Sequence, residues 1–360
     1  EDNLDFISFG KLRGSYGITG NDQIGDYRYL DAYRATPGPG GLYPTQLANS
    51  NFSWESTKKL EFALELGLFK NRTNLNLSWY RNRSSNQLVG YTLPSITGFT
   101  SVEANLPATV QNQGWELELS ADIIKNKNFN WRSSINLSIP KNELIAFEDI
   151  EQSSYARAFE VGEPLSIQKV YHFNGLDTET GLYQIEDAND DGRYDYQDQV
   201  INEDLGRVYF GGLYNQLSYK NFSLSLLMEF VKHKGNEFYI NTPGFFGYLI
   251  DNGQYVNGLP VNDGVQAPSQ SIDALLAYEN VVRSDLWISD ASFLRMKTVD
   301  LSYKIPEKLF SSQSLPDIQL FVQGQNLFTI TNYKGLDPQS PGSRNLPPLR
   351  TISAGLSLTF

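Results

Sequence analysis

An acidic segment in the middle of the chain has the spacing of a calcium-binding loop. Numbered as a loop of twelve residues from Asp187 to Asp198, it has oxygen-bearing side chains at positions 1, 3, 5, 9 and 12 and glycine at position 6. Calcium takes about six to eight oxygen ligands at flexible geometry, and this spacing brings them around one centre. The spacing predicts a structural Ca²⁺ site whose ligands are Asp187, Asn189, Asp191, the Arg193 carbonyl, Asp195 and Asp198.

The alternative for this segment is an Asx-rich surface turn, because the same residue types also close turns without a metal. Position 12 is Asp198, whose carboxylate reaches less far than the usual glutamate. No helical pattern flanks the loop, so bound calcium would brace a long loop rather than form an EF-hand.

Aromatic residues form a second candidate set, and they gather in two long loops. We expect substrate contacts at Tyr27, Tyr29 and Tyr33 in the first loop and at Phe245, Phe246 and Tyr248 in the fourth. Flat rings with polar tips stack on sugars and anchor protein interfaces. Packing of the loops against one another is the alternative for each of these rings.

Catalytic chemistry has little support in the sequence. The two histidines, His172 and His233, stand on different loops without a ligand-spaced partner, and there is no cysteine. No nucleophile elbow, P-loop or dinucleotide-binding motif occurs. Glu116 and Glu118 share a strand face, which could in principle serve a glycosidase, but a water-filled interior explains them more simply. We therefore expect no catalytic residues and no enzyme activity.

Charge and composition narrow the class of protein. A net charge of −12, with no basic patch apparent in the sequence, makes nucleic acid a poor partner. No window reaches the roughly 18 consecutive apolar residues of a membrane-spanning helix, so strands would have to do any spanning. The 21 tyrosines and 21 phenylalanines suit aromatic girdles or a sugar-binding surface.

Strict alternation of apolar and polar residues predicts about ten strands. The last ten residues alternate without exception, with Ile352, Leu356 and Leu358 on the apolar face. Hairpins are predicted at 60–80, 115–137 and 213–230, a first strand at 11–19, and a ninth strand around 318–322. A change of parity near Lys297 and Thr298 predicts a β-bulge. Glu118, Asp122 and Asn136 face away from the apolar positions and require water on that side.

Short and long connections alternate along the chain. Short turns are expected near 69–72, 125–128, 220–221 and 306–316, and long loops at 20–53, 84–112, 140–207, 232–292 and 331–349. An up-and-down meander places all long loops at one end, as in outer-membrane barrels with long extracellular loops. The C-terminus then lies on the periplasmic side. A large soluble all-β protein is the alternative.

An ordered series of motifs resembles the C-terminal barrel half of the SusC/RagA family, TonB-dependent outer-membrane transporters of Bacteroidetes. The series consists of 11–17 with 19–21, 51–57, 67–72, 93–99, 112–116, 162–165, the acidic segment from Asp187, 287–288, 294–297, 324–328 and 335–338. Each motif is weak alone, and the order makes the series specific. One departure is Asn105-Leu106-Pro107, where the family tends to carry glycine at the third position.

The resemblance implies an all-β fold, an antiparallel transmembrane β-barrel segment of about ten of the family's about 22 strands. Residues 1–360 would be its C-terminal part, and a plug domain, the first dozen strands and the TonB-contacting segment would lie elsewhere, because open edges are not tolerated in lipid. The implied function is TonB-driven import of a large nutrient, an oligosaccharide or a peptide, in the outer membrane with a SusD-like lipoprotein. Three alternatives are a passive porin-like channel, a soluble surface protein that binds or cleaves glycans, and a family member used for adhesion or secretion.

Overall fold

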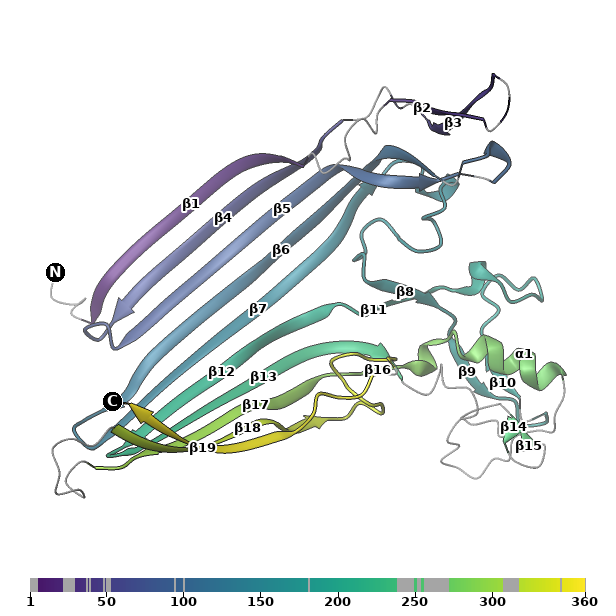
Figure 1. Ribbon diagram of the computed structural model, residues 1–360. Coiled ribbons are helices and arrows are strands. Elements are labelled where there is room, and N and C mark those ends of the chain that lie inside the picture. Colours follow the sequence, from purple (N-terminus) through teal and green to yellow (C-terminus); the bar gives the residue numbers. More distant parts are fainter. Residues whose placement is uncertain are drawn as a thin grey trace.

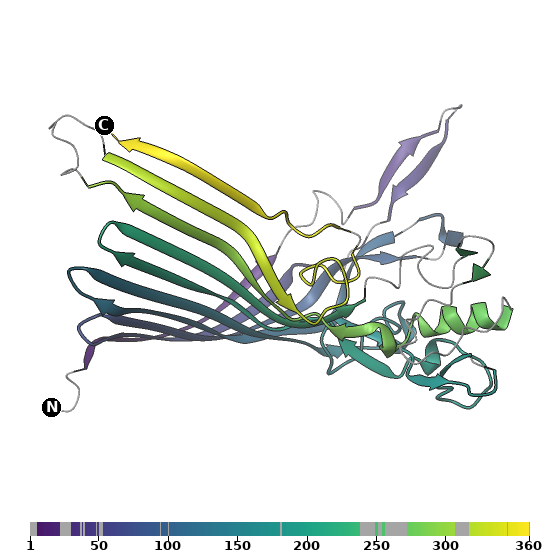
Figure 2. The same ribbon diagram turned by 90° about the horizontal axis from the view of Figure 1, so that it is seen from below.

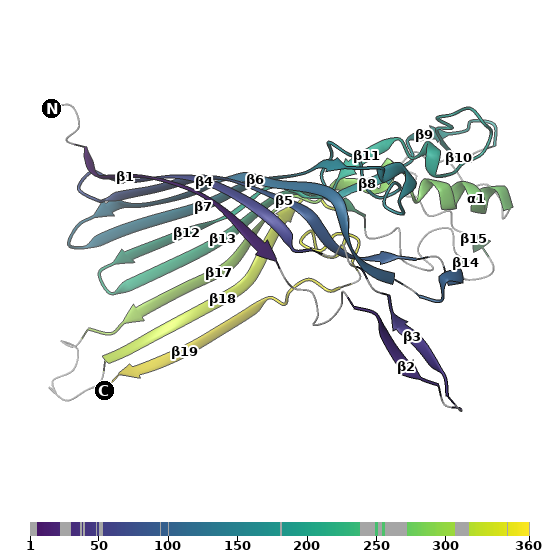
Figure 3. The same ribbon diagram turned by 90° about the horizontal axis from the view of Figure 1, so that it is seen from above.

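A curved antiparallel sheet forms the frame of the protein, like part of a cylinder wall (Figures 2 and 3). The computed structural model describes residues 6–21, 30–36, 38, 40–47, 49, 53–93, 95–99, 101–180, 182–237, 249–250, 254–255, 272–306, 317–343 and 345–359. Within these residues, ten strands pair in the order β1-β4-β5-β6-β7-β12-β13-β17-β18-β19 (Figure 1). Their bounds are β1 Ile7–Asn21, β4 Glu55–Leu68, β5 Thr73–Thr92, β6 Ser101–Lys125, β7 Phe129–Phe147, β12 Arg207–Tyr219, β13 Phe222–Asn236, β17 Phe293–Lys304, β18 Asp317–Thr331 and β19 Thr351–Thr359.

Short turns gather at one end of the sheet and long connections at the other. The β4–β5 turn has positive φ at Phe69, Lys70 and Asn71, and the β12–β13 turn at Lys220. The start of β1 and the end of β19 lie at this short-turn end (Figure 1). The predicted all-β meander, with its strand order and its asymmetry of ends, is confirmed in the described residues.

One predicted loop is wrong, because most of 84–112 is strand. β5 continues to Thr92 and β6 starts at Ser101, and their pairing passes an irregularity between Ser85 and Gln87. The 3₁₀ turn Ser95–Thr97 lies in the short connection. Apolar residues still alternate here at Leu106, Ala108 and Val110 of β6, which form a buried cluster with Leu144. Irregularities in the pairing of β6 with β5 and β7 interrupt the pattern that the rest of the strand follows.

The register of the ladders gives the sheet one apolar and one polar face. One row of side chains crosses six neighbouring strands on the apolar face: Leu66, Leu75, Leu119, Ile135, Leu213 and Met228. Aromatic residues bound this face: the tilted rings of Phe222 and Tyr303 lie toward the short turns, with their centres 4.5 Å apart, and Trp79 pairs with Trp115 toward the long loops. An apolar band between two aromatic levels is typical of the lipid-facing side of a barrel.

We predict that an arginine on the apolar face destabilises the whole protein far more than one on the polar face. Leu119 lies between Leu75 and Ile135 in the apolar row, and its neighbour Glu118 points to the other side. Leu119→Arg is expected to lower the free energy of unfolding in lipid vesicles by about 2–4 kcal/mol. The matched control Glu118→Arg should change it much less, and equal losses in urea titrations of both variants would contradict the assignment of faces.

The predicted bulge in β17 is confirmed. The register of β17 against both β13 and β18 shifts beside Lys297, between Met296 and Thr298. The bulge reverses the parity of the strand, so Leu294 and Met296 share the apolar face with Val299 and Leu301.

Two long connections build a common module at the long-loop end (Figure 1). Its elements are β8 Ile167–Val170, β9 Phe173–Leu176, β10 Tyr183–Ile185, β11 Ile201–Asp204, α1 Ile272–Val281 and β16 Ile288–Asp290, with 3₁₀ turns Ile150–Gln152, Tyr196–Asp198 and Asp285–Trp287. Two short pairs, β2 Ala32–Ala35 with β3 Leu42–Gln46 and β14 Leu249–Ile250 with β15 Gln254–Tyr255, also belong to the long connections. None of the described helices has the length and hydropathy needed to cross a membrane.

The core of this loop module joins residues from both connections. Trp287 is 2% exposed and packs with Tyr183 and Val281. Asp285 accepts hydrogen bonds from the Phe173 amide at 2.9 Å and contacts His172 Nδ1 at 2.8 Å. The β7–β12 and β13–β17 connections are therefore held together by an apolar core and by polar ties.

Candidate functional site: the polar row and the anchored segment

A row of polar residues crosses the polar face from β1 to β18. Cross-strand register places in it Lys11, Glu65, Asn76, Glu118, Asn136, Gly212, Glu229, Arg295 and Thr329. The alternation of each strand puts these positions opposite the apolar row, so the same sequence pattern that makes a lipid-type face also makes this polar row.

The row is only partly neutralised by its neighbours. Arg13 Nε lies 2.7 Å from Glu65 Oε1, and Lys297 Nζ lies 3.2 Å from Glu229 Oε2. Glu118 forms no ion pair with any side chain that the structure describes. Asn76 Oδ1 is buried and accepts no hydrogen bond from the described residues, an arrangement that costs about 1–3 kcal/mol unless water or another segment supplies a donor. The row therefore has free capacity to bind polar groups.

A hollow of about 550 Å³ opens in the polar row around Gly212, and Glu118, Asn136 and Tyr214 contribute to its lining. A Cβ on Gly212 would lie 3.3 Å from Asn136 Oδ1 and 3.4 Å from the Met228 carbonyl oxygen. The Gly212 amide donates a hydrogen bond to Asn136 Oδ1. Glycine thus keeps the hollow open and leaves the amide side chain of Asn136 fixed at its edge.

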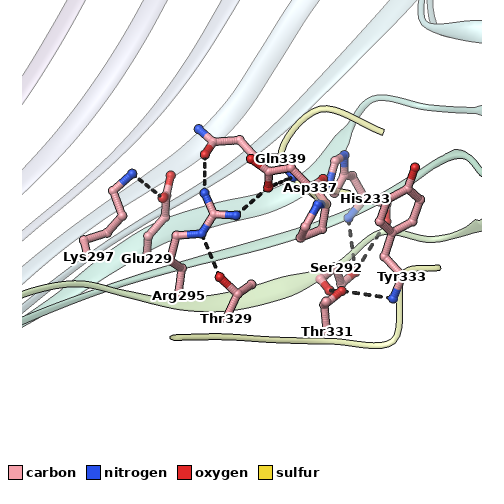
Figure 4. Close-up of polar contacts among 11 residues, drawn as sticks. Glu229, His233, Ser292, Arg295, Lys297, Thr329, Thr331, Tyr333, Asp337 and Gln339 are labelled. Atoms are coloured by element: carbon pink, nitrogen blue, oxygen red, sulfur yellow. Dashed lines mark hydrogen bonds and ion pairs between the residues drawn. The ribbon is translucent and has the colours of Figure 1, made fainter. Parts of the chain in front are cut away.

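The segment Tyr333–Gly342, here called the anchored segment, folds onto the polar face at the β17 end of the row (Figure 4). Arg295, 2% exposed, forms an ion pair with Asp337, and its Nη1 donates to Gln339 Oε1 at 2.7 Å. Its Nε donates to Thr329 Oγ1 at 3.0 Å. The planar guanidinium fork suits such a multiply bonded buried position better than lysine would.

Two further contacts hold the ends of the anchored segment. His233 Nε2 donates to the Pro338 carbonyl oxygen at 2.9 Å. The Tyr333 hydroxyl donates to the Asn236 carbonyl oxygen at 2.8 Å and accepts from the Gly342 amide at 2.8 Å. Residues of β13, β17 and β18 therefore fix a segment that would otherwise be a free loop, and it covers part of the polar face.

Sequence reasoning did not find this ion pair. Arg295 and Asp337 appeared in it only as parts of separate motifs, because they are 42 positions apart in the sequence. A clue was available in the type of residue, since an arginine among the apolar residues Leu294 and Met296 needs a buried acceptor. The sequence contains no signal that identifies which of the many acidic residues supplies it.

The acidic loop at 187–198 is closed by its own backbone in this structure. Asp187 accepts the amides of Asp191 and Gly192, and Asp198, fully buried, accepts the amides of Ala188 and Asp195. Gly192 has φ of +76°, as the sharp turn at position 6 requires. Within the described part of the chain, no group of three or more His, Cys, Asp or Glu side chains is placed to hold a metal. The donor types suit Ca²⁺, and calcium binding stays a prediction.

The predicted aromatic contacts are mostly beyond reach of the structure. Tyr33 lies in β2, 58% exposed, opposite Pro44 of β3. Tyr27, Tyr29, Phe245, Phe246 and Tyr248 lie outside the described residues. Tyr33 therefore lies apart from the polar row, and the contacts of the other five stay predictions.

Many families of β-barrel proteins contain a sheet of ten strands with one lipid-type face. Comparison with known families shows to which of them the chain belongs. Residues 3–327 match the model described as "TonB dependent receptor-like, beta-barrel". The chain belongs to this TonB-dependent receptor β-barrel family. The resemblance to SusC/RagA proteins found in the sequence is confirmed by the relatives that follow.

The chain is similar to TonB-dependent receptors over nearly its full length. It is 26% identical to TonB-dependent receptor P39 of Formosa agariphila, covering 99% of this chain and 41% of the receptor. It is 26% identical to the TonB-dependent receptor SusC of Bacteroides thetaiotaomicron, covering 99% of this chain and 38% of SusC. A solved structure of the RagAB peptide importer in its closed-closed state has the same fold, with a TM-score of 0.78 at 23% identity, covering 99% of this chain and 41% of that chain. The chain thus spans about 40% of the length of these relatives.

Proposed function

We propose that this chain supplies the C-terminal part of an outer-membrane barrel that imports a large nutrient, an oligosaccharide or a peptide, with energy from TonB. The supporting observation is the polar row. It crosses nine strands from Lys11 to Thr329 and lies behind a lipid-type face, and its Glu118 has no ion-pair partner among the described residues. Charged and amide groups at this density require a wet interior, which a transport path provides.

The proposal includes the parts that would complete the barrel. The free edges of β1 and β19 need partner strands in a bilayer, because unpaired backbone groups are not tolerated in lipid. An N-terminal part with a plug and about a dozen strands would pair with both edges and meet the polar row from inside. The unsatisfied Asn76 Oδ1 then gains donors from plug, ligand or water.

We assign the long-loop end to the cell exterior and the C-terminus to the periplasm. A SusD-like lipoprotein would bind over the loop module, and the lipoprotein and the loops would capture the ligand together. Surface labelling of a cysteine introduced at Ile272, which is 77% exposed on α1, should succeed in intact cells. Labelling only after lysis would reverse the proposed orientation.

Active import is tested by uptake in cells that carry the full-length transporter. Uptake of a labelled oligosaccharide or peptide pool should fall to background when the proton motive force is dissipated or when TonB is absent. Uptake that persists without energy would favour a passive porin-like channel. A protein that extracts from cells without detergent would instead favour a soluble glycan-binding β protein.

We also propose that Ca²⁺ binds the 187–198 loop and braces the loop module. The supporting observations are the side-chain oxygens of Asp187, Asn189 and Asp191, the turn at Gly192, and the hydrogen bond that the Gln197 amide donates to Asp195 Oδ1 on the far side of the loop. Isothermal titration of the chelator-treated full transporter should show Ca²⁺ binding in the range of about 10⁻⁴–10⁻³ M, as in extracellular modules. Asp187→Asn with Asp191→Asn should abolish this heat, and Asp177→Asn, in a separate turn, should leave it unchanged. Equal heats in all three proteins would contradict the site.

A further inference from the structure

Three cations on the apolar face lie just beyond the aromatic level toward the long loops. Arg81 follows Trp79 by two residues on the same face, and its guanidinium carbon lies 6.0 Å from the centre of the Trp79 ring. Arg83 lies two residues further along β5, and Lys58 is its direct cross-strand partner on β4. Lys58, Arg81 and Arg83 are here called the cationic patch.

The cationic patch lacks internal compensation. None of its three members forms an ion pair with a carboxylate that the structure describes, and Arg83 Nε donates only to the neutral Gln111 Oε1, at 2.6 Å. Like charges directly opposite each other, such as Lys58 and Arg83, destabilise a strand pair. An anion bound between them would remove this repulsion.

Other cations at this level of the sheet do have partners. On the same face of β13, Lys232 pairs with Asp290 at 2.8 Å and Lys234 with Glu203 at 2.6 Å. On β7, Lys141 pairs with Glu143 at 2.9 Å. The lack of an ion-pair partner among the described residues therefore distinguishes the cationic patch from Lys141, Lys232 and Lys234 on the same face.

We propose that the cationic patch binds the phosphate groups of lipid headgroups in the leaflet that meets the long-loop end, the outer leaflet of the outer membrane. The position fits, because headgroup phosphates lie next to the aromatic level of a barrel, and one strand residue advances about 3.3 Å. The chemistry fits, because arginine binds phosphate through two parallel hydrogen bonds. The Arg81 guanidinium lies over the Trp79 ring, and an interfacial arginine can keep this contact while its N–H groups bind an anion.

The inference rests on the outer-membrane location and orientation proposed above, and its test is separate from theirs. The probes are diphosphorylated lipid A and the same lipid A after phosphatase treatment, added to the full-length transporter in detergent and counted by native mass spectrometry. Wild type should bind the phosphorylated form at least roughly tenfold more tightly, and Arg81→Gln with Arg83→Gln should lose this preference, at roughly fivefold per cation.

The matched control is Lys59→Gln, since Lys59 neighbours Lys58 on β4 but faces the other side, opposite Asn82. It should keep the wild-type preference. Equal binding of both lipids by wild type, equal loss in Lys59→Gln, or binding of inorganic phosphate as tight as that of the lipid would each overturn the proposal. If the double variant does not fold, Lys58→Gln is measured instead, with a heat-shifted gel band as the folding check. Membrane fractionation and surface labelling of wild type report on the proposed location alone.

Discussion

Replacing Arg295 by methionine is expected to release the anchored segment from the polar face. The change leaves Asp337, 7% exposed, as an uncompensated buried carboxylate and removes the donor to Gln339. Removing one partner of a buried ion pair costs about 3–5 kcal/mol. Hydrogen exchange at the amides of Gln339, Ser340 and Gly342 in the full-length protein should speed up by a factor corresponding to that loss, while exchange in β5 and β6 stays unchanged.

The control for this prediction is the double variant Arg295→Met with Asp337→Asn. It removes both charges together, so the penalty of an isolated buried charge disappears and much of the protection should return. The two single variants and the double variant form a cycle whose coupling energy isolates the ion pair. Wild-type exchange rates in Arg295→Met would show that His233 and Tyr333 suffice to hold the segment.

Replacing Trp287 by alanine is expected to separate the two connections of the loop module. Trp287 is 2% exposed and its ring fills the space between Val281 and Tyr183. Truncation of a buried tryptophan costs about 3–5 kcal/mol, and a small module has no second core to offset it. Limited proteolysis should then cleave both the 167–204 and the 272–290 regions, although the mutation is in only one of them.

We expect the strands of the barrel to stay folded in Trp287→Ala, in contrast to the loop module. Heat-shifted mobility on gels should remain as in wild type, since the ladders between β7, β12 and β13 do not depend on Trp287. Trp115→Ala, on the apolar face and 51% exposed, is the matched control and should leave both loop regions resistant. Cleavage confined to the mutated connection would contradict a shared core.

Alternation in the sequence was a good guide wherever one face meets lipid. It predicted the hairpins, the strand order that follows from them, and the bulge beside Lys297. Alternate residues of a strand face opposite sides, so a change in the alternation is visible in the local sequence. It failed at 84–112, where the pairing of β5 with β6 passes an irregularity and where Leu106, Ala108 and Val110 of β6 form a buried cluster with Leu144. The polar row was foreseen as inward-facing residues, but its membership depends on register, which is set by turn geometry and pairing across many strands.

The candidate site was harder to predict for the same physical reason. Arg295 and Asp337 become partners only after β17 and β18 pair and the chain turns back over them. The calcium prediction rests on a contiguous segment, so sequence alone could formulate it. An ion pair between residues far apart in the sequence can be predicted only from the tertiary structure. A metal-binding loop formed by neighbouring acidic residues can be predicted from the sequence alone.

The shared core of the loop module constrains how the β7–β12 and β13–β17 connections can change in evolution. Tyr171 and Ser284 form a parallel bridge, and the amides of Tyr171 and Asp285 bond across it in both directions, at 3.0 Å each. A receptor of this kind that acquires a new ligand by altering one loop must preserve this seam or change both sides together. Among its relatives, residues 171–173 and 283–287 should therefore covary, and a loop transplanted alone between two receptors should fail where the pair succeeds.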